Sequence, residues 1–115
     1  MKDIMSINIL GQPYKLIFET EKENPKLGCG DGYCDWTSKT IVVDKSILER
    51  AYKRKSLDNI DSYFAKVIRH EIIHAFLFES GLERASHNEQ CVDWFAMQWD
   101  KVNDVFNSIF EKETE

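Results

Sequence analysis

The chain has 115 residues, of which 43% are hydrophobic and 30% charged, which is typical of one globular domain and excludes disorder throughout. No apolar run approaches the ~20 residues of a membrane span, and the N-terminus lacks the apolar core of a signal peptide. The net charge of −5 disfavours a nucleic-acid partner, because binding to phosphates needs an excess of basic side chains.

The three cysteines, Cys29, Cys34 and Cys91, are an odd number in a chain with no export signal. Such thiols are normally reduced in the cytoplasm. Cys29 and Cys34 are also too far apart for the CxxC spacing of a redox pair or a zinc knuckle. The sequence therefore predicts a cytoplasmic protein with free thiols.

Four short strands are predicted in the first half of the chain. Residues 6–9 and 14–18 alternate between apolar and polar, with a turn at 11–13 between them. Residues 33–37 and 40–43 form a second pair around a two-residue turn. We therefore expect two hairpins that contribute to one small sheet.

A short helix is predicted next, over residues 45–53, with Asp44 as its N-cap. This region is basic. Its cationic residues are Lys45, Arg50, Lys53, Arg54 and Lys55. Such a run most often forms a solvated helix face, and the alternative is a surface for an acidic partner or nucleic acid.

A long central helix begins at Asp58 or Asp61 and ends at Gly81, a residue typical of helix C-termini. Residues 72–78 are apolar on nearly every side of this helix, apart from His74. A helix of that kind is buried rather than laid on a surface. We therefore expect it to lie against the sheet.

A second long helix is predicted to begin near His87 or Asn88 and to end at about Phe110, before a fraying tail over residues 110–115. A loop over residues 83–86 is expected to fold it back, antiparallel, on the central helix. Apolar residues recur along it at steps of three and four: Val92, Phe95, Trp99, Val102, Phe106 and Ile109. The elements together predict one α+β domain over residues 1–115, with a small mixed or antiparallel sheet packed on two long helices.

The central helix carries the sequence His70-Glu71-Ile72-Ile73-His74, which fits the pattern HExxH. His70 and His74 lie one helical turn apart, so both imidazoles can reach one Zn²⁺ at ~2.0–2.1 Å. Glu71 flanks the same site without being a ligand. There it can accept a proton from a water molecule that attacks a carbonyl carbon.

The alternative interpretation is that His70 and His74 are two core histidines of an apolar helix. It would leave two imidazoles and a carboxylate unpaired in the most hydrophobic part of the chain, which is costly. A bound cation removes that cost, so we favour a metal site.

A catalytic zinc site needs a third protein ligand. Glu89 and Asp93 are four residues apart on the second helix, so Glu89 can face the histidine pair as that ligand. Asp93 can then accept a hydrogen bond from a ligating histidine. Two alternatives stand beside this. In one, Glu89 is an N-terminal acid that only favours the helix dipole, and in the other, His87 is the third ligand.

The string HEIIH followed by NEQCVD resembles the gluzincin pattern, HExxH then NExxxD, of thermolysin-like zinc peptidases. Together with the hairpin GYCDWTSKTIVVD, it also resembles small metallopeptidase-like proteins of phages and prophages, over about residues 30–100. The resemblance implies a zincin-like fold, with His70, His74 and Glu89 as zinc ligands. It also implies that Glu71 is the catalytic base and that Asp93 supports a histidine.

This sequence departs from the gluzincin pattern in the short interval between His74 and Glu89. The residue that steadies the oxyanion is also not assigned, and His87, Tyr33 and Tyr63 are candidates. In zincins a substrate peptide pairs with a sheet edge beside the metal, for which residues 33–37 or 40–43 are available.

We therefore expect a minimal zinc-dependent peptidase that acts on a peptide or protein substrate in the cytoplasm of a bacterial host. Manganese, cobalt or nickel would fit the same ligands. The alternative is a metal-stabilised binding or regulatory module of phage origin with weak or no peptidase activity. A purely structural zinc site would have four protein ligands and no use for a base at Glu71.

Overall fold

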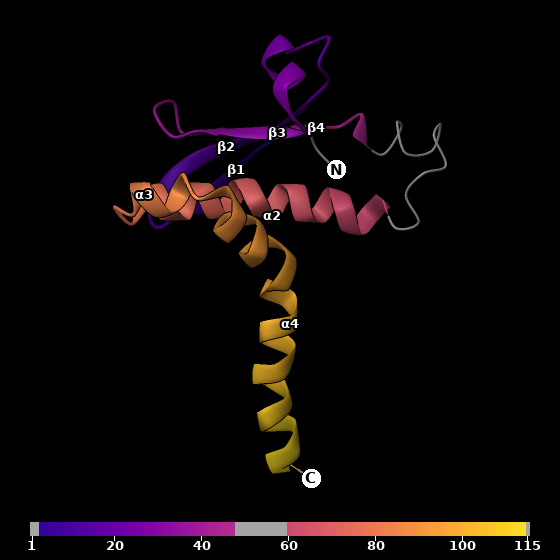
Figure 1. Cartoon of the computed structure of the whole chain (residues 1–115), viewed down its shortest axis with the longest axis vertical. Coiled ribbons are helices and arrows are strands. Elements are labelled where there is room, and N and C mark those ends of the chain that lie inside the picture. The colour runs from indigo at the N-terminus through magenta and orange to yellow at the C-terminus, as the bar shows by residue number, and fades with distance from the viewer. Residues whose placement is uncertain (1–2, 48–59, 115) are drawn as a thin grey trace.

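The computed structural model describes residues 3–47 and 60–114, with the exception of a few side chains. Figure 1 shows the strands on one side of a long helix, α2, while another long helix, α4, leaves from the opposite side. The protein is thus a small α+β structure with a four-stranded sheet and helices. Among the described residues, no helix combines the length and hydrophobicity that crossing a bilayer requires.

The four predicted strands are confirmed, as β1 (Ile4–Ile9), β2 (Gln12–Glu19), β3 (Gly32–Asp35) and β4 (Thr40–Asp44). They form one mixed sheet in the order β1-β2-β4-β3. Both hairpins are antiparallel, and β2 and β4 join them as a parallel pair in the middle. As a consequence β3 lies at one edge of the sheet, whereas β4 is internal.

The turns differ slightly from the prediction. The first hairpin turns at Leu10 and Gly11, which both have positive φ angles, of 51° and 88°, as a tight two-residue turn requires. Gln12 already belongs to β2. In the second hairpin β3 ends at Asp35, because its carboxylate accepts hydrogen bonds from Thr37 and Ser38 and closes the turn. A short 3₁₀ helix, η1 (Pro25–Cys29), lies in the connection between β2 and β3.

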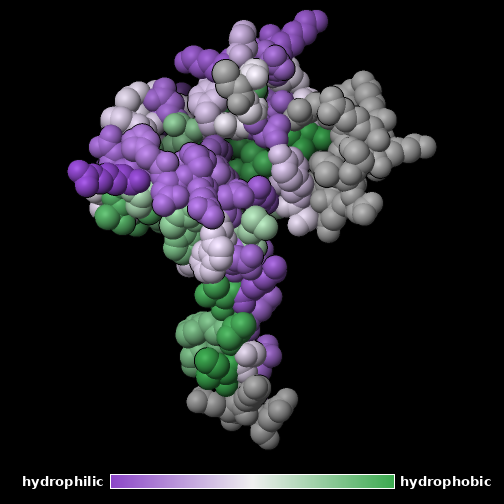
Figure 2. Space-filling view, viewed as in Figure 1, coloured by the Kyte–Doolittle hydropathy of each residue, from purple (hydrophilic) through white to green (hydrophobic). Residues whose placement is uncertain are grey.

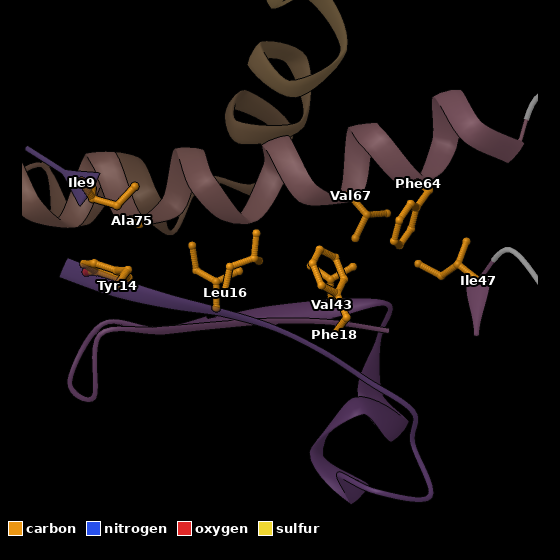
Figure 3. Packing of buried hydrophobic residues seen from close by; sticks show 10 residues of the cluster. Ile9, Tyr14, Leu16, Phe18, Val43, Ile47, Phe64, Val67 and Ala75 are labelled. Carbon is orange, nitrogen blue, oxygen red and sulfur yellow. The ribbon is translucent and has the colours of Figure 1, made fainter. Parts of the chain in front are cut away.

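The main core lies between the sheet and α2 (Ile60–Glu79). Figure 3 shows side chains of β2 and β4 pointing toward the helix, where Phe64, Val67 and Ala75 face them. The aromatic rings of Phe18 and Phe64 are 5.9 Å apart and tilted. The alternation along β2 therefore buries one face of the sheet, as predicted, whereas β4 is buried on both faces. The buried members of the core are Ile9, Tyr14, Leu16, Phe18, Ile41, Val43, Ile47, Phe64, Val67 and Ala75.

The segment after α2 is wrongly predicted as a loop, because residues 83–86 form one helical turn, α3 (Glu83–Ser86). Asn88 then caps α4 (Glu89–Thr114), since its side-chain oxygen accepts a hydrogen bond from the amide of Cys91 at 3.0 Å. The start of α4 agrees with the prediction, and its end lies beyond the predicted Phe110. The short α3 fixes the direction in which α4 leaves α2.

The prediction that α4 lies antiparallel along α2 is wrong. Instead, the first turns of α4 cross α2, and the rest of α4 points away from the sheet (Figure 1). Val92 and Ala96 are fully buried at the crossing. The Nε of Arg69 also donates a hydrogen bond to the carbonyl oxygen of Ala96, at 2.7 Å. The small side chain of Ala96 permits this close approach of the two helices.

The apolar stripe of α4, which the sequence assigned to the core, is mostly exposed to solvent. We define this stripe as Val92, Phe95, Trp99, Val102, Phe106 and Ile109. Only Val92 is buried, and Trp99 and Phe106 have 50% and 55% of their surface exposed. Figure 2 shows hydrophobic residues along one side of the projecting helix. Beyond Val92, the stripe is therefore largely uncovered by the described part of this chain.

Two further predictions concern residues at or beyond the limits of the structure. The short helix predicted over residues 45–53 and its basic residues lie, apart from residues 45–47, outside the described residues. The carboxylate of Asp44 accepts hydrogen bonds from the amide and hydroxyl of Ser46, at 2.9 and 2.6 Å. Cys34 and Cys91 are free thiols, as expected, whereas the side chain of Cys29 lies outside the described residues.

Candidate metal centre

The middle of α2 brings His70, Glu71 and His74 together on the side of the helix that faces β3 and the start of α4. One donor atom from each of the three residues lies within 4.8 Å of the others. The two imidazole rings have their centroids 4.9 Å apart, and their Nε2 atoms are separated by 3.2 Å. This His/Glu/His group can therefore hold a metal ion.

Glu89, the first residue of α4, contacts both histidines. Its Oε2 lies 2.9 Å from Nε2 of His70, and its Oε1 lies 3.1 Å from Nε2 of His74. The Asn88 cap fixes where α4 begins, and thereby the direction of the Glu89 side chain. The crossing of α4 over α2 brings this carboxylate to the histidine pair, even though the two helices are not antiparallel.

The other ring nitrogen of each histidine has its own partner. Nδ1 of His70 lies 3.2 Å from the Asp93 carboxylate, and Nδ1 of His74 lies 2.9 Å from the hydroxyl oxygen of Ser86. Nδ1 of His70 is assigned as a donor, because the Asp93 carboxylate can only accept a hydrogen bond. Nδ1 of His74 is also assigned as a donor, because the Ser86 hydroxyl donates its own proton to the carbonyl of His74. Burial also lowers the pKa of His74, which favours its neutral ring. Nε2 of each ring faces the Glu89 carboxylate.

The two Nε2 atoms thus lie 3.2 Å apart, and each is 2.9 or 3.1 Å from a different oxygen of the Glu89 carboxylate. A tetrahedral zinc ion with ligands at 2.0–2.1 Å would hold neighbouring ligand atoms about 3.3–3.4 Å apart. The separation of the two Nε2 atoms, 3.2 Å, is close to this value, and the Glu89 carboxylate lies next to both. Without a cation or a proton, the converging lone pairs would repel one another. The residues present therefore fit a transition-metal ion.

Glu71 differs from Glu89 in its surroundings. Its side chain is buried, and its Oε2 has no hydrogen-bond partner among the described residues. Burial, and next the charge of Glu89, raise the pKa of Glu71 to about 8. A buried carboxylate without a partner is costly unless function or a ligand requires it. Beside the histidine pair, this side chain is a candidate to accept a proton near neutral pH.

The remaining candidates line the same cavity, which has a volume of about 470 Å³. The hydroxyl of Tyr63 donates a hydrogen bond to Asp31, and the hydroxyl of Tyr33 accepts one from Nδ2 of Asn24 at 2.8 Å. His87 is largely exposed, and its Nε2 lies 3.7 Å from the carboxylate of Glu83 rather than beside the other histidines. The structure thus places the predicted site residues around one cavity, with His87 at a different position from the histidine pair.

Cys34 also lines the cavity, although the sequence did not single it out for this site. Burial, followed by the negative charge of Glu71, raises the pKa of its thiol to about 12. Cys34 is part of the wall of the cavity, and its thiol is not one of the donor atoms that converge at the histidine pair.

Two residues that hold the site were missed by the sequence interpretation. Ser86 has 1% of its surface exposed and holds His74 from α3, which was predicted to be a loop. Lys66 lies one turn before His70 on α2 and forms an ion pair with Asp93 at 2.9 Å. This contact lowers the pKa of Asp93, so that it stays a carboxylate. The spacing of Lys66 from His70 was visible in the sequence, whereas nothing indicated Ser86.

Gly32 allows β3 to pass close to the site. A Cβ atom at this position would lie 3.0 Å from the carbonyl oxygen of Val42 and 3.3 Å from Cγ of Glu71. We therefore expect Gly32→Ala to lower the free energy of unfolding by about 1–3 kcal/mol, as overpacking does. Urea denaturation measures this change. Gly30→Ala is the control, because its Cβ would have no neighbour closer than 3.9 Å. An equal loss of unfolding free energy in both variants would refute the explanation.

Comparison with known proteins adds no relative from which a function could be inferred. The chain matches no protein-family model, no curated protein and no solved structure. Its function is therefore inferred from the geometry and chemistry of the residues described above.

Proposed function

We propose that the protein is a minimal zinc-dependent peptidase of gluzincin type with a zincin-like fold. In this proposal His70, His74 and Glu89 are the metal ligands, and Glu71 is the catalytic base. One observation carries it: two imidazole nitrogens and a carboxylate converge to within 3.2 Å beside a buried carboxylate that has no partner. That is the donor set of a three-ligand catalytic zinc site, with a fourth position left for the reaction.

A bound zinc ion supplies Lewis acidity, which lowers the pKa of water and polarises a carbonyl group. Glu71 takes the proton of the attacking water and passes it to the amine of the leaving peptide. A raised pKa suits both steps, because the group must accept and release a proton near neutral pH. Asp93 and Ser86 hold the two imidazoles so that each presents Nε2 to the site.

The sheet supports one of the two expected substrate edges. Of these two strands, β3 lies at the edge of the described sheet, next to the cavity, whereas β4 pairs with strands on both sides. An extended peptide could add to β3 as a further antiparallel or parallel strand, with its backbone held by hydrogen bonds. We propose that the substrate binds there. His87, which lines the same cavity, is the candidate to steady the oxyanion.

The proposed positioning residues give a prediction about metal affinity. We expect Asp93→Ala and Ser86→Ala each to weaken zinc binding by ~10–100-fold, because a histidine that loses its Nδ1 partner is free to rotate. His87→Ala is the matched control and should bind zinc as the wild type does. Competitive titration with a chromophoric chelator measures the three affinities. A large loss of zinc affinity in His87→Ala, with the affinity of Asp93→Ala unchanged, would overturn this assignment of the metal ligands and of the residues that position them.

The direct test of function combines metal analysis with a cleavage assay. The purified protein, reconstituted with zinc, is expected to contain one ion per chain by elemental analysis. It is then incubated with a broad peptide library, and new termini are identified by mass spectrometry. Cleavage that disappears on chelation and returns with zinc supports the peptidase. A protein that binds no transition metal, even after reconstitution, would refute it.

A metal-stabilised binding module is the second candidate function. It is favoured by the way the site joins elements, since Glu89 at the start of α4 contacts two histidines in the middle of α2. A metal there would fasten α4 to α2 whether or not a reaction takes place. Stoichiometric zinc without any cleavage in the library would favour this module. The unpartnered Oε2 of Glu71 favours the peptidase, because a structural site does not need it.

A further inference from the structure

The apolar stripe of α4 continues into an apolar groove at the base of the same helix. The groove has a volume of about 470 Å³ and lies between α2 and α4. Its apolar lining consists of Ile72, Ile73, Phe76 and Leu77 from α2 and Phe95 and Trp99 from α4. We propose that a second copy of this chain covers both features, through antiparallel pairing of the two α4 helices about a twofold axis.

The spacing of the stripe indicates a helix as the occupant. Its six residues are separated by alternating steps of three and four, which is a repeat of 3.5 residues. A helix that merely lies on a core follows the 3.6-residue period, whereas a strict 3.5-residue repeat is the seam of paired helices. The repeat runs along the full stripe from Val92 to Ile109, beyond the crossing with α2. This seam is therefore built to face another helix.

The charges around the stripe permit a second copy of the same helix. The residues that border the seam are uncharged between Phe95 and Phe110: Ala96, Gln98, Asn103 and Val105. The acidic residues Asp100 and Asp104 occupy heptad positions away from the seam, as does Lys101. Two identical helices can therefore meet without placing like charges opposite each other. The charged residue that lines the groove, Arg69, is already paired with Asp100 at 3.4 Å.

The exposed area is sufficient for a dimer. Aromatic side chains bury 150–250 Å² each, so the half-exposed rings and aliphatic groups of α4 offer on the order of 600 Å² per copy. These residues are Phe95, Trp99, Val102, Val105, Phe106, Ile109 and Phe110. Two copies would bury about 1,200 Å², before any contribution of the groove, which reaches the lower limit of a stable specific interface.

The position of the groove determines the orientation. It lies at the N-terminal part of α4, where Phe95 and Trp99 contribute to it, whereas Phe106 and Ile109 lie toward the opposite end. In an antiparallel pair the tip of each helix reaches the groove of the other copy. Parallel pairing would cover the stripe and leave both grooves open. Antiparallel pairing thus buries all of this apolar surface in one isologous interface.

The test uses the full chain and its mass in solution. Sedimentation velocity is expected to give twice the 13.5 kDa of the chain for the wild type. Phe106→Glu should weaken association by at least about a hundredfold, because it buries a carboxylate in the seam. Asn107→Glu is the matched control, since it introduces the same side chain on the next residue, off the seam, and should remain dimeric. Circular dichroism checks that both variants are folded.

An equimolar mixture of Phe106→Glu and Phe106→Lys chains tests the orientation. In a parallel pair the two positions face each other, so the mixture would associate, whereas in the antiparallel pair they lie apart and the mixture stays monomeric. Association of the mixture would overturn the antiparallel arrangement. A wild type that is monomeric at every concentration, or a dimer that persists in Phe106→Glu, would overturn the proposal as a whole.

Discussion

The variant Glu71→Gln is expected to bind zinc as tightly as the wild type and to cleave peptides about 100- to 10,000-fold more slowly. Glutamine has nearly the same shape as glutamate, but it cannot take a proton from water. The buried Oε2 of Glu71 makes no hydrogen bond among the described residues, so the substitution breaks none at that atom. Turnover number and metal content, measured on the same preparation, check this result.

Glu89→Gln is the matched comparison for this experiment, because the chemical change is identical. Its carboxylate contacts Nε2 of both His70 and His74, so the amide should lose most of the zinc affinity and, with it, the activity. The two variants therefore separate a base from a ligand. If Glu71→Gln kept full turnover on a peptide that the wild type cleaves, the proposed mechanism would be wrong.

Removal of the metal is expected to lower the melting temperature by about 10 °C or more, relative to protein saturated with zinc. A ligand that binds only the folded state stabilises it by mass action. The proposed ligands also join the middle of α2 to the start of α4, so the unfolded chain offers no comparable site. Differential scanning calorimetry, with and without chelator, measures the shift.

The Glu89→Gln variant again provides the control for the melting experiment. Its melting temperature should respond little to zinc or to chelator, because the site has lost a ligand. An unchanged wild-type curve, with loss of metal confirmed by elemental analysis, would contradict the proposed link between metal and fold. An equal response of both proteins would show that zinc acts elsewhere on the chain.

The sheet and the histidine motif could be predicted because local patterns encode them. Alternating apolar residues such as Leu16 and Phe18 define which face of a strand is buried, and a spacing of four residues places His70 and His74 on one helix face. The sheet order was not predicted, because the parallel pairing of β2 with β4 depends on contacts between distant parts of the chain.

The course of α4 was predicted wrongly for a physical reason. Its apolar periodicity indicates that one face is covered, but does not say by what. The sequence predicts that α2 packs on this face, whereas the structure leaves residues such as Val102 and Phe106 exposed. The helical turn α3 sets the direction of α4, and a turn of four residues has too little sequence signal to be recognised. Ser86 was missed for the same reason, since it belongs to that turn.

The projecting part of α4 has a consequence for the helix–coil equilibrium of the molecule. Beyond Ala96 the helix has no buried residue, as far as its side chains are described. An isolated helix of about 12–15 residues is only marginally stable in water, because few hydrogen bonds offset the cost of nucleation. The backbone amides of this segment are therefore protected from solvent exchange only to the extent that something outside the chain's own core holds the helix in place.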